Sequence, residues 1–196
     1  MARTKNFDRQ QKLTAAMGLF WQQGYAQTSV SDLVSHLAIN RFSLYNTYGD
    51  KLALYQEALD KYLQTIALPA VSALRDHNSS FPQLLTFLEH FVQLQRKQHC
   101  GCFLQNAILE RAPSDEYVLQ ISDQFFDSLT QAFCFTLTNA INRGEIDQAV
   151  SPIKTSRFLA MQMQGIRVLG KAKQYQTMDD GVYILFDYLQ RLKVSH

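Results

Sequence analysis

The sequence predicts an all-α protein, and three observations support this fold class. Glycine and proline, which interrupt helices, number only 8 and 4 among 196 residues. Most apolar runs repeat at intervals of three and four residues, the spacing of one helix face, rather than at the interval of two typical of strands. Hydrophobic residues make up 46% of the chain and aromatic residues 12%, enough to form a packed core and to exclude disorder.

The first predicted helix covers about residues 8–23 and ends at Gly24. Glycine is common just past a helix end, because it accepts a left-handed backbone without strain. The helix has one apolar stripe, which is expected to face the core: Leu13, Ala16, Met17, Phe20 and Trp21.

Residues 28–51 predict two short helices joined by a tight turn. Thr28 or Ser29 begins the first helix, since either hydroxyl can accept from a backbone N–H of the first turn. Asp32 stands three residues after Ser29, the spacing of a capping box. Asn40 favours a turn or cap, so the first helix ends before it and a second helix begins directly after it.

The second of these helices carries polar and aromatic side chains on the face that its core does not need. Leu44 and Tyr48 are predicted to face the core. The side chains expected to point away are Arg41, Phe42, Ser43, Tyr45 and Asn46. A short helix with such a face, placed after a turn from another helix, is typical of a helix-turn-helix that reads DNA.

The outward side chains predict contacts from their chemistry. Arg41 can bond a guanine edge or a phosphate, and Asn46 suits adenine. Ser43 and Tyr45 can bond phosphates or bases, while Phe42 can touch a thymine methyl or a sugar, or fold back on the domain. The residues expected to hold the DNA backbone are Thr28, Ser29, Tyr48 and Lys51. The alternative for both tyrosines is packing within the small domain.

Further anchors accompany this pattern between about residues 9 and 55. They are Phe20, Gly24-Tyr25, Thr28-Ser29-Val30, Leu44-Tyr45, Tyr48-Gly49 and Lys51. With these residues at fixed spacing, the stretch resembles the DNA-binding domain of the TetR family of bacterial transcriptional regulators. Ala38 stands where that family usually has a turn glycine, and it costs little provided that its φ stays negative. Phe42 stands where the family usually has a small residue.

The resemblance implies two domains and a regulatory function. Residues 1–51 are expected to form a three-helix DNA-binding domain, and residues 52–196 a larger helical domain for ligand binding and dimerisation. We expect a repressor that leaves its operator when a small molecule or an electrophile acts on it. The alternative is a helical small-molecule- or protein-binding module that no longer binds DNA, with Ala38 and Phe42 as the changes responsible.

Positive charge is concentrated in the same N-terminal stretch. Residues 1–51 hold six basic and three acidic residues, whereas the remainder holds 13 basic and 14 acidic residues. The basic residues of this stretch are Arg3, Lys5, Arg9, Lys12, Arg41 and Lys51. The charge alone also fits an ordinary solvated surface, but it coincides with the predicted helix-turn-helix, where it would neutralise DNA phosphates.

The last two predicted helices, about residues 152–171 and 178–193, are apolar over more than one face. Such helices need partners on two sides. In proteins of the family resembled here the final helices pair with those of a second subunit in a four-helix bundle, so we expect a homodimer through these segments. Two reading helices would then recognise a palindromic double-stranded operator. The alternative is that both helices only complete the core of a monomer.

The segment HCGCFLQNAILERAP, residues 99–113, resembles the ligand-domain signature of one TetR subgroup, which has a Gly-Cys motif. The effector itself is not identified by the sequence. The candidates to line an apolar effector cavity are Phe91, Cys102, Phe103, Phe126, Phe158 and Met161. The same side chains also fit a plain hydrophobic core.

Cys100 and Cys102 lie beside His99, whose imidazolium would favour the thiolate form. The resembled subgroup includes regulators that sense electrophiles through a cysteine after a glycine, so both thiols are candidate redox residues. The alternative is an inert buried thiol. With three cysteines and neither C-x-x-C nor a second cluster, no metal site or disulfide is predicted.

Catalytic motifs are absent from the sequence. It has no P-loop, no G-x-G-x-x-G and no serine in a G-x-S-x-G elbow, and its five histidines are scattered. We therefore expect neither an enzyme nor a cofactor. The N-terminal residues lack the apolar region of a signal peptide, and no stretch approaches the ~18 apolar residues of a membrane span. A cytoplasmic protein without membrane contact is predicted.

Overall fold

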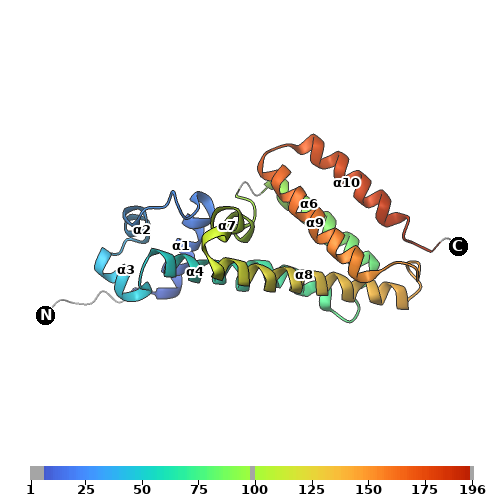
Figure 1. The fold of residues 1–196 in the computed structure, drawn as a ribbon, viewed down its shortest axis with the longest axis horizontal. Coiled ribbons are helices and arrows are strands. Elements are labelled where there is room, and N and C mark those ends of the chain that lie inside the picture. The colour runs from blue at the N-terminus through green and yellow to red at the C-terminus, as the bar shows by residue number, and fades with distance from the viewer. Residues whose placement is uncertain (1–6, 98–99, 195–196) are drawn as a thin grey trace. The chain divides into compact units, whose positions relative to one another are not determined.

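The computed structural model describes residues 7–97 and 100–194, so Arg3, Lys5 and His99 lie outside the described residues. Within these two stretches the chain is helical, with one isolated bridge between Ile146 and Lys193 and no sheet, which confirms the all-α prediction (Figure 1). The helices are α1 (Arg9–Gln23), α2 (Val30–Leu37), α3 (Arg41–Tyr48), α4 (Lys51–Tyr62), α5 (Leu68–Ser72), α6 (Phe81–Lys97), α7 (Phe103–Arg111), α8 (Glu116–Asn142), α9 (Pro152–Lys171) and α10 (Tyr175–Gln190). None of the helices in the described stretches is long and apolar enough to span a bilayer.

The chain divides into two compact units. Unit 1 contains Met1–Ala67 and Cys102–Ser122, and unit 2 contains Leu68–Gly101 and Asp123–His196. This division differs from the predicted boundary after residue 51, because α4 packs along α1 and also contacts α7. Unit 1 therefore joins the helix-turn-helix to segments far along the chain.

Unit 1 is built around an aromatic cluster contributed by α1, α4, α7 and the turn after α1. Tyr55 packs edge-on against Phe20 and Tyr25, each 5.1 Å away between ring centroids, and against Phe103 at 5.4 Å. Edge-on aromatic pairs add to the stability gained by burial alone. Trp21 of the predicted apolar stripe is only half-buried, whereas the other four residues of that stripe are buried. The cluster fixes α7 against α4 and the turn after α1.

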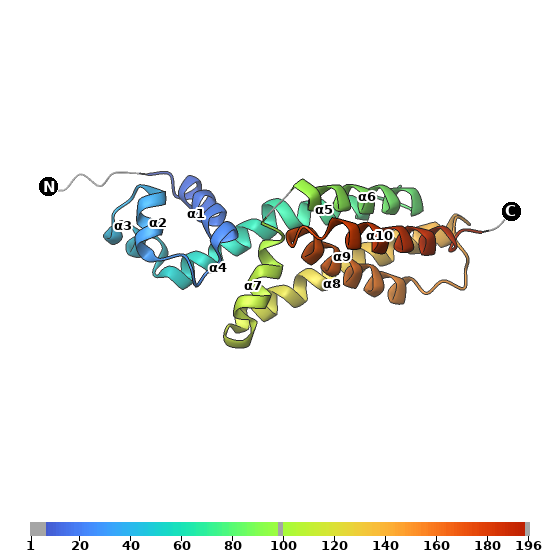
Figure 2. The ribbon, with the colours of Figure 1, turned by 90° about the horizontal axis from the view of Figure 1, so that it is seen from above.

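In unit 2, α6 and α10 each pack against α9 (Figure 2). The backbone of α9 comes so close to α6 that a Cβ added at Gly170 would lie 2.7 Å from the Cβ of Gln95. The bounds of α9 agree with the predicted range. By contrast, α10 begins three residues before its predicted start, because the Gln174 carbonyl already accepts a helical hydrogen bond from the Met178 N–H.

Candidate nucleic-acid interface

Side-chain caps fix the starts of both helices of the helix-turn-helix. Ser29 Oγ accepts from the Asp32 N–H at 3.1 Å, and Asp32 Oδ2 accepts from the Ser29 N–H at 2.8 Å, which completes the predicted capping box of α2. Hydrogen bonds from Ser29 hold the pKa of the Asp32 carboxyl below its usual value. Asn40 Oδ1 accepts from the Ser43 N–H at 2.7 Å and caps α3. Both helix starts therefore follow from the local sequence.

The turn between α2 and α3 places Ala38 in a left-handed conformation, with φ 49° and ψ 45°. This finding corrects the expectation that the backbone of Ala38 keeps a negative φ. The Ala38 N–H donates to the Ser35 carbonyl at 3.2 Å, and the left-handed residue ends α2. A residue with a Cβ is strained in this region, whereas glycine is not.

Helix α3 directs most of the predicted reading side chains outward. The exposed ones are Arg41, Phe42, Tyr45 and Asn46, with Ser43 half-buried. The Phe42 ring is 73% exposed, so it does not fold back on the domain. The Arg41 guanidinium lies 6.0 Å from the Tyr45 ring centroid, within the range of a cation–π contact. The exposed face of α3 thus combines hydrogen-bonding groups with one large apolar ring.

Two side chains that the sequence assigns to the DNA backbone point inward instead. Thr28 is fully buried, and its hydroxyl donates to the Gly24 carbonyl at 2.7 Å. The buried Tyr48 hydroxyl donates to the Arg9 carbonyl at 2.9 Å, and the Arg9 guanidinium lies 5.0 Å from the Tyr48 ring centroid. Burial raises the pKa of Tyr48 above its usual value. Both side chains therefore pack into the core of unit 1, which for Tyr48 is the alternative that the sequence left open.

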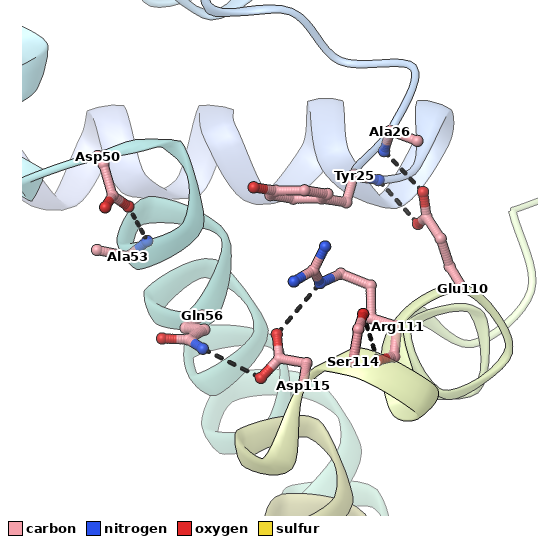
Figure 3. Close-up of polar contacts among 9 residues, drawn as sticks. All are labelled: Tyr25, Ala26, Asp50, Ala53, Gln56, Glu110, Arg111, Ser114 and Asp115. Carbon is pink, nitrogen blue, oxygen red and sulfur yellow. Dashed lines mark hydrogen bonds and ion pairs between the residues drawn. The ribbon is translucent and has the colours of Figure 1, made fainter.

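Lys51 begins α4 close to the turn that follows α1. The side chain of Asp50 caps this helix, since its Oδ1 accepts from the Ala53 N–H at 2.8 Å (Figure 3). The Lys51 Nζ lies 4.2 Å from the Tyr25 ring centroid, and partial burial lowers the pKa of the Lys51 ammonium. A cation beside the first N–H groups of a helix suits a phosphate. Ser29, at the start of α2, is exposed.

A carboxylate of α7 contacts this region, although no sequence motif marks it as part of the DNA-binding helices. Glu110 Oε2 accepts from the Tyr25 N–H at 2.9 Å, and Glu110 Oε1 accepts from the Ala26 N–H at 2.6 Å (Figure 3). The neighbouring Arg111 guanidinium lies 4.1 Å from the Tyr25 ring centroid. The one sequence signal for Glu110 is its place in the Gly-Cys segment, which predicts a ligand domain.

The six candidate effector residues fall in different units. In unit 1, the Tyr62 hydroxyl donates to the buried Cys102 Sγ at 3.3 Å, and the adjacent Phe103 belongs to the aromatic cluster. The four in unit 2 are Phe91, Phe126, Phe158 and Met161. Met161 is 61% exposed on α9, which corrects its assignment to an enclosed apolar cavity.

Two of the grooves formed by described residues of unit 2 can be compared with the predicted effector site. One, of about 330 Å³, lies between α6 and α10, and the other, of about 410 Å³, lies between the segment that precedes α9 and the end of α10. Neither is lined by any of the six candidates. Phe91 is buried with the Arg167 guanidinium 5.1 Å from its ring centroid, and Phe158 packs against Tyr188 at 5.3 Å. These neighbours fit a packed core as well as a ligand site.

The three cysteines differ in burial. Cys102 is buried, Cys100 and Cys134 are half-buried, and none of the three thiols forms a disulfide. In the part of the chain that the structure describes, no group of three or more histidines, cysteines or carboxylates is placed to hold a metal ion.

Known proteins similar to this chain decide its family. The family description "Bacterial regulatory proteins, tetR family" matches residues 13–58. YezE of Bacillus subtilis (strain 168), described as an uncharacterized HTH-type transcriptional regulator, is 31% identical over 149 residues, which span 75% of this chain and 77% of YezE. The chain belongs to the TetR family. This confirms the resemblance seen in its N-terminal residues.

Two further proteins match most of the chain. ComR of Escherichia coli (strain K12), an HTH-type transcriptional repressor, is 28% identical over 174 residues, which span 85% of this chain and 80% of ComR. A cysteine mutant of the TetR family regulator CifR, solved with 26-bp double-strand operator DNA, matches with a TM-score of 0.78 at 23% identity, over 96% of this chain and 98% of CifR. The likeness to CifR shows that the two share a fold.

Proposed function

We propose that this TetR-family regulator is a homodimeric repressor that binds a palindromic double-stranded operator through α3 and leaves it when an effector acts. The exposed face of α3 carries the proposal, because Arg41, Phe42 and Asn46 are directed outward on a helix that Asn40 caps. Related proteins support it, since ComR is described as a repressor and CifR was solved with operator DNA.

Each exposed side chain has a chemical role in this proposal. Arg41 donates to a guanine edge or a phosphate, and Asn46 pairs with adenine. Phe42, an apolar ring held in water, contacts a thymine methyl in the major groove. Ser29 and Lys51 hold phosphates together with the first N–H groups of α2 and α4.

The substitution Arg41→Ala tests the role of α3. Binding should weaken by about 1–3 kcal/mol per half-site, because a base or phosphate contact is lost, while the dimer mass stays unchanged. The matched control is Arg191→Ala, which removes an exposed guanidinium from unit 2 and should leave affinity unchanged. Affinity is measured by gel shift, at several salt concentrations, on a duplex that the wild type enriches from a random double-stranded library.

Two results would contradict this part of the proposal. If Arg41→Ala binds the duplex as tightly as the wild type, Arg41 makes no contact with DNA, which contradicts the proposed place of α3 in the major groove. A wild type that enriches no duplex, even in dilute salt where phosphate contacts are strongest, favours the alternative module that does not bind DNA.

The proposed dimer rests on apolar side chains exposed along α9 and α10. On α10, Tyr183 is 76% and Ile184 is 65% exposed. The others are Ile153, Met161 and Val168 on α9, and Tyr188 on α10. Soluble monomers rarely leave a large apolar patch in water. These two neighbouring helices are therefore proposed to pair with the same helices of a second copy as a four-helix bundle.

Ile184→Glu is expected to produce a monomer, because it places a charge in the proposed apolar interface. The mass is measured by light scattering during size-exclusion chromatography. Leu119→Glu, at an exposed leucine of α8, is the control and should remain a dimer. A dimeric Ile184→Glu protein, or a monomeric wild type, would refute this interface.

The effector is proposed to act on residues 52–196, either by non-covalent binding or through the Cys102 thiol beside Tyr62. If Cys102 is the sensor, alkylation by N-ethylmaleimide should release DNA from the wild type and from Cys134→Ser, but not from Cys102→Ser. Release that persists in Cys102→Ser refutes Cys102 as the sensor. No catalysis or cofactor is proposed, since the similar proteins are transcriptional regulators. We propose that the protein acts in the cytoplasm, where a regulator of bacterial DNA meets its operator.

A further inference from the structure

The last residues of α7 hold the turn between α1 and α2 through backbone donors. Both carboxylate oxygens of Glu110 are used, one on the Tyr25 N–H at 2.9 Å and one on the Ala26 N–H at 2.6 Å (Figure 3). Hydrogen bonds to an ionised acceptor are about twice as strong as those between neutral groups. A two-point contact also fixes the orientation of the turn, which a single bond would not do.

The conformation of Gly24 shows that the turn accommodates this carboxylate closely. Gly24 has φ +82°, and a Cβ built on it would lie 3.1 Å from Glu110 Oε2. A side chain at this position would therefore be strained by its backbone and crowded by the carboxylate. The turn then continues to Thr28, whose buried hydroxyl donates to the Gly24 carbonyl, and directly to Ser29. The carboxylate thus acts just before the start of α2.

A second link joins the same end of α7 to Lys51. The Tyr25 ring has the Arg111 guanidinium at 4.1 Å and the Lys51 ammonium at 4.2 Å from its centroid. Arg111 is itself held by Asp115, whose Oδ2 accepts from Arg111 Nε at 3.1 Å and whose Oδ1 accepts from Gln56 Nε2 of α4 at 3.3 Å (Figure 3). The end of α7 therefore contacts the turn that leads to Ser29 and the tyrosine ring on which Lys51 packs. Ser29 and Lys51 are two of the proposed phosphate-binding residues.

We infer that Glu110 is a positioning residue for DNA binding: it fixes the turn at Tyr25 and Ala26, and so the start of α2, in the orientation that holds a phosphate. This inference rests on the proposed function. Without the carboxylate, the two N–H groups turn to water and the turn must be ordered again each time DNA binds, which lowers affinity.

The sign of the effect separates positioning from simple electrostatics. Removing a negative charge from a DNA-binding unit strengthens its attraction for phosphates, so a purely electrostatic effect would tighten binding. Loss of positioning weakens it. Glu110→Gln keeps the shape of the side chain but replaces one acceptor oxygen by an amide donor, which cannot accept from a backbone N–H.

The test compares Glu110→Gln with Glu116→Gln, which removes the same charge from an exposed residue in the first turn of α8. Fluorescence anisotropy measures affinity for the duplex that the wild type enriches from a random library. We expect roughly tenfold weaker binding by Glu110→Gln and no weakening by Glu116→Gln. Hydrogen exchange at Tyr25 and Ala26 should be faster in Glu110→Gln alone, because only that variant loses the acceptor.

Glu110→Asp provides a second variant that keeps the charge but shortens the side chain, so it should weaken binding as well. Unchanged or tighter binding by both Glu110 variants overturns the inference, as does faster exchange at the turn without loss of affinity. If the wild type itself enriches no duplex, the proposed function fails. If the wild type binds a duplex and the Glu110 variants bind it equally tightly, only the inference about Glu110 fails.

Discussion

Ala38→Gly is expected to stabilise the protein, by an amount that follows from the backbone of the turn. Ala38 has φ 49° and ψ 45°. The left-handed conformation costs a residue with a Cβ roughly 1–2 kcal/mol, a cost that glycine does not have. Glycine in turn loses more conformational freedom on folding, which offsets about 0.4–1 kcal/mol of this gain. The free energy of unfolding should therefore rise by about 0.5–1 kcal/mol.

Urea unfolding followed by circular dichroism, at one fixed protein concentration, measures this change. Ala15→Gly is the matched control, since it makes the same substitution inside α1, where the backbone is helical. That variant should lose about 1 kcal/mol. Operator affinity should stay unchanged in Ala38→Gly, because the turn keeps its conformation. If Ala38→Gly is destabilised as much as Ala15→Gly, the turn is not left-handed in solution and the reasoning is refuted.

Three further substitutions test packing and capping. Gly170→Ala should lower the free energy of unfolding by about 1–3 kcal/mol, because its Cβ would lie 2.7 Å from that of Gln95; an unchanged urea midpoint would contradict this packing. Gly18→Ala should raise it by about 1 kcal/mol, because nothing lies within 4 Å of the added Cβ inside α1; the same urea titration measures it. Asp32→Asn should make the free energy of unfolding fall less steeply as the pH is lowered into the acid range. The folded pKa of Asp32 lies below its ordinary 3.8, so its contribution is present above that pH and is lost as pH falls through the folded value. If the free energy of unfolding of the wild type and of Asp32→Asn falls equally steeply at acid pH, the result would count against the capping box with Ser29.

Local sequence was sufficient to predict the caps of the helix-turn-helix. The Ser29–Asp32 capping box and the Asn40 cap join atoms that lie three residues apart, so their geometry is present in the spacing itself. The same holds for α9, whose bounds agree with the predicted range, since proline is favoured in a first turn and the apolar period continues to the end.

Side chains whose chemistry suits more than one environment were harder to place. Thr28 and Tyr48 carry hydroxyls that suit a phosphate, yet both are buried and donate to carbonyls of α1 or the turn after it. Met161 has the apolar character of a cavity residue, yet it is exposed on α9. In each case the competing environments have similar chemistry, and only packing selects between them.

The sequence by itself determined the fold class, the two short helices α2 and α3 and the family to which the chain belongs, because helical period, capping and anchor spacing are local properties. Only the tertiary structure decided the left-handed turn at Ala38 and the contact of Glu110 with the Tyr25 N–H, a donor 85 positions away along the chain. No local pattern encodes such a contact, since it exists only once the aromatic cluster of unit 1 has packed α7 against α4 and the turn after α1.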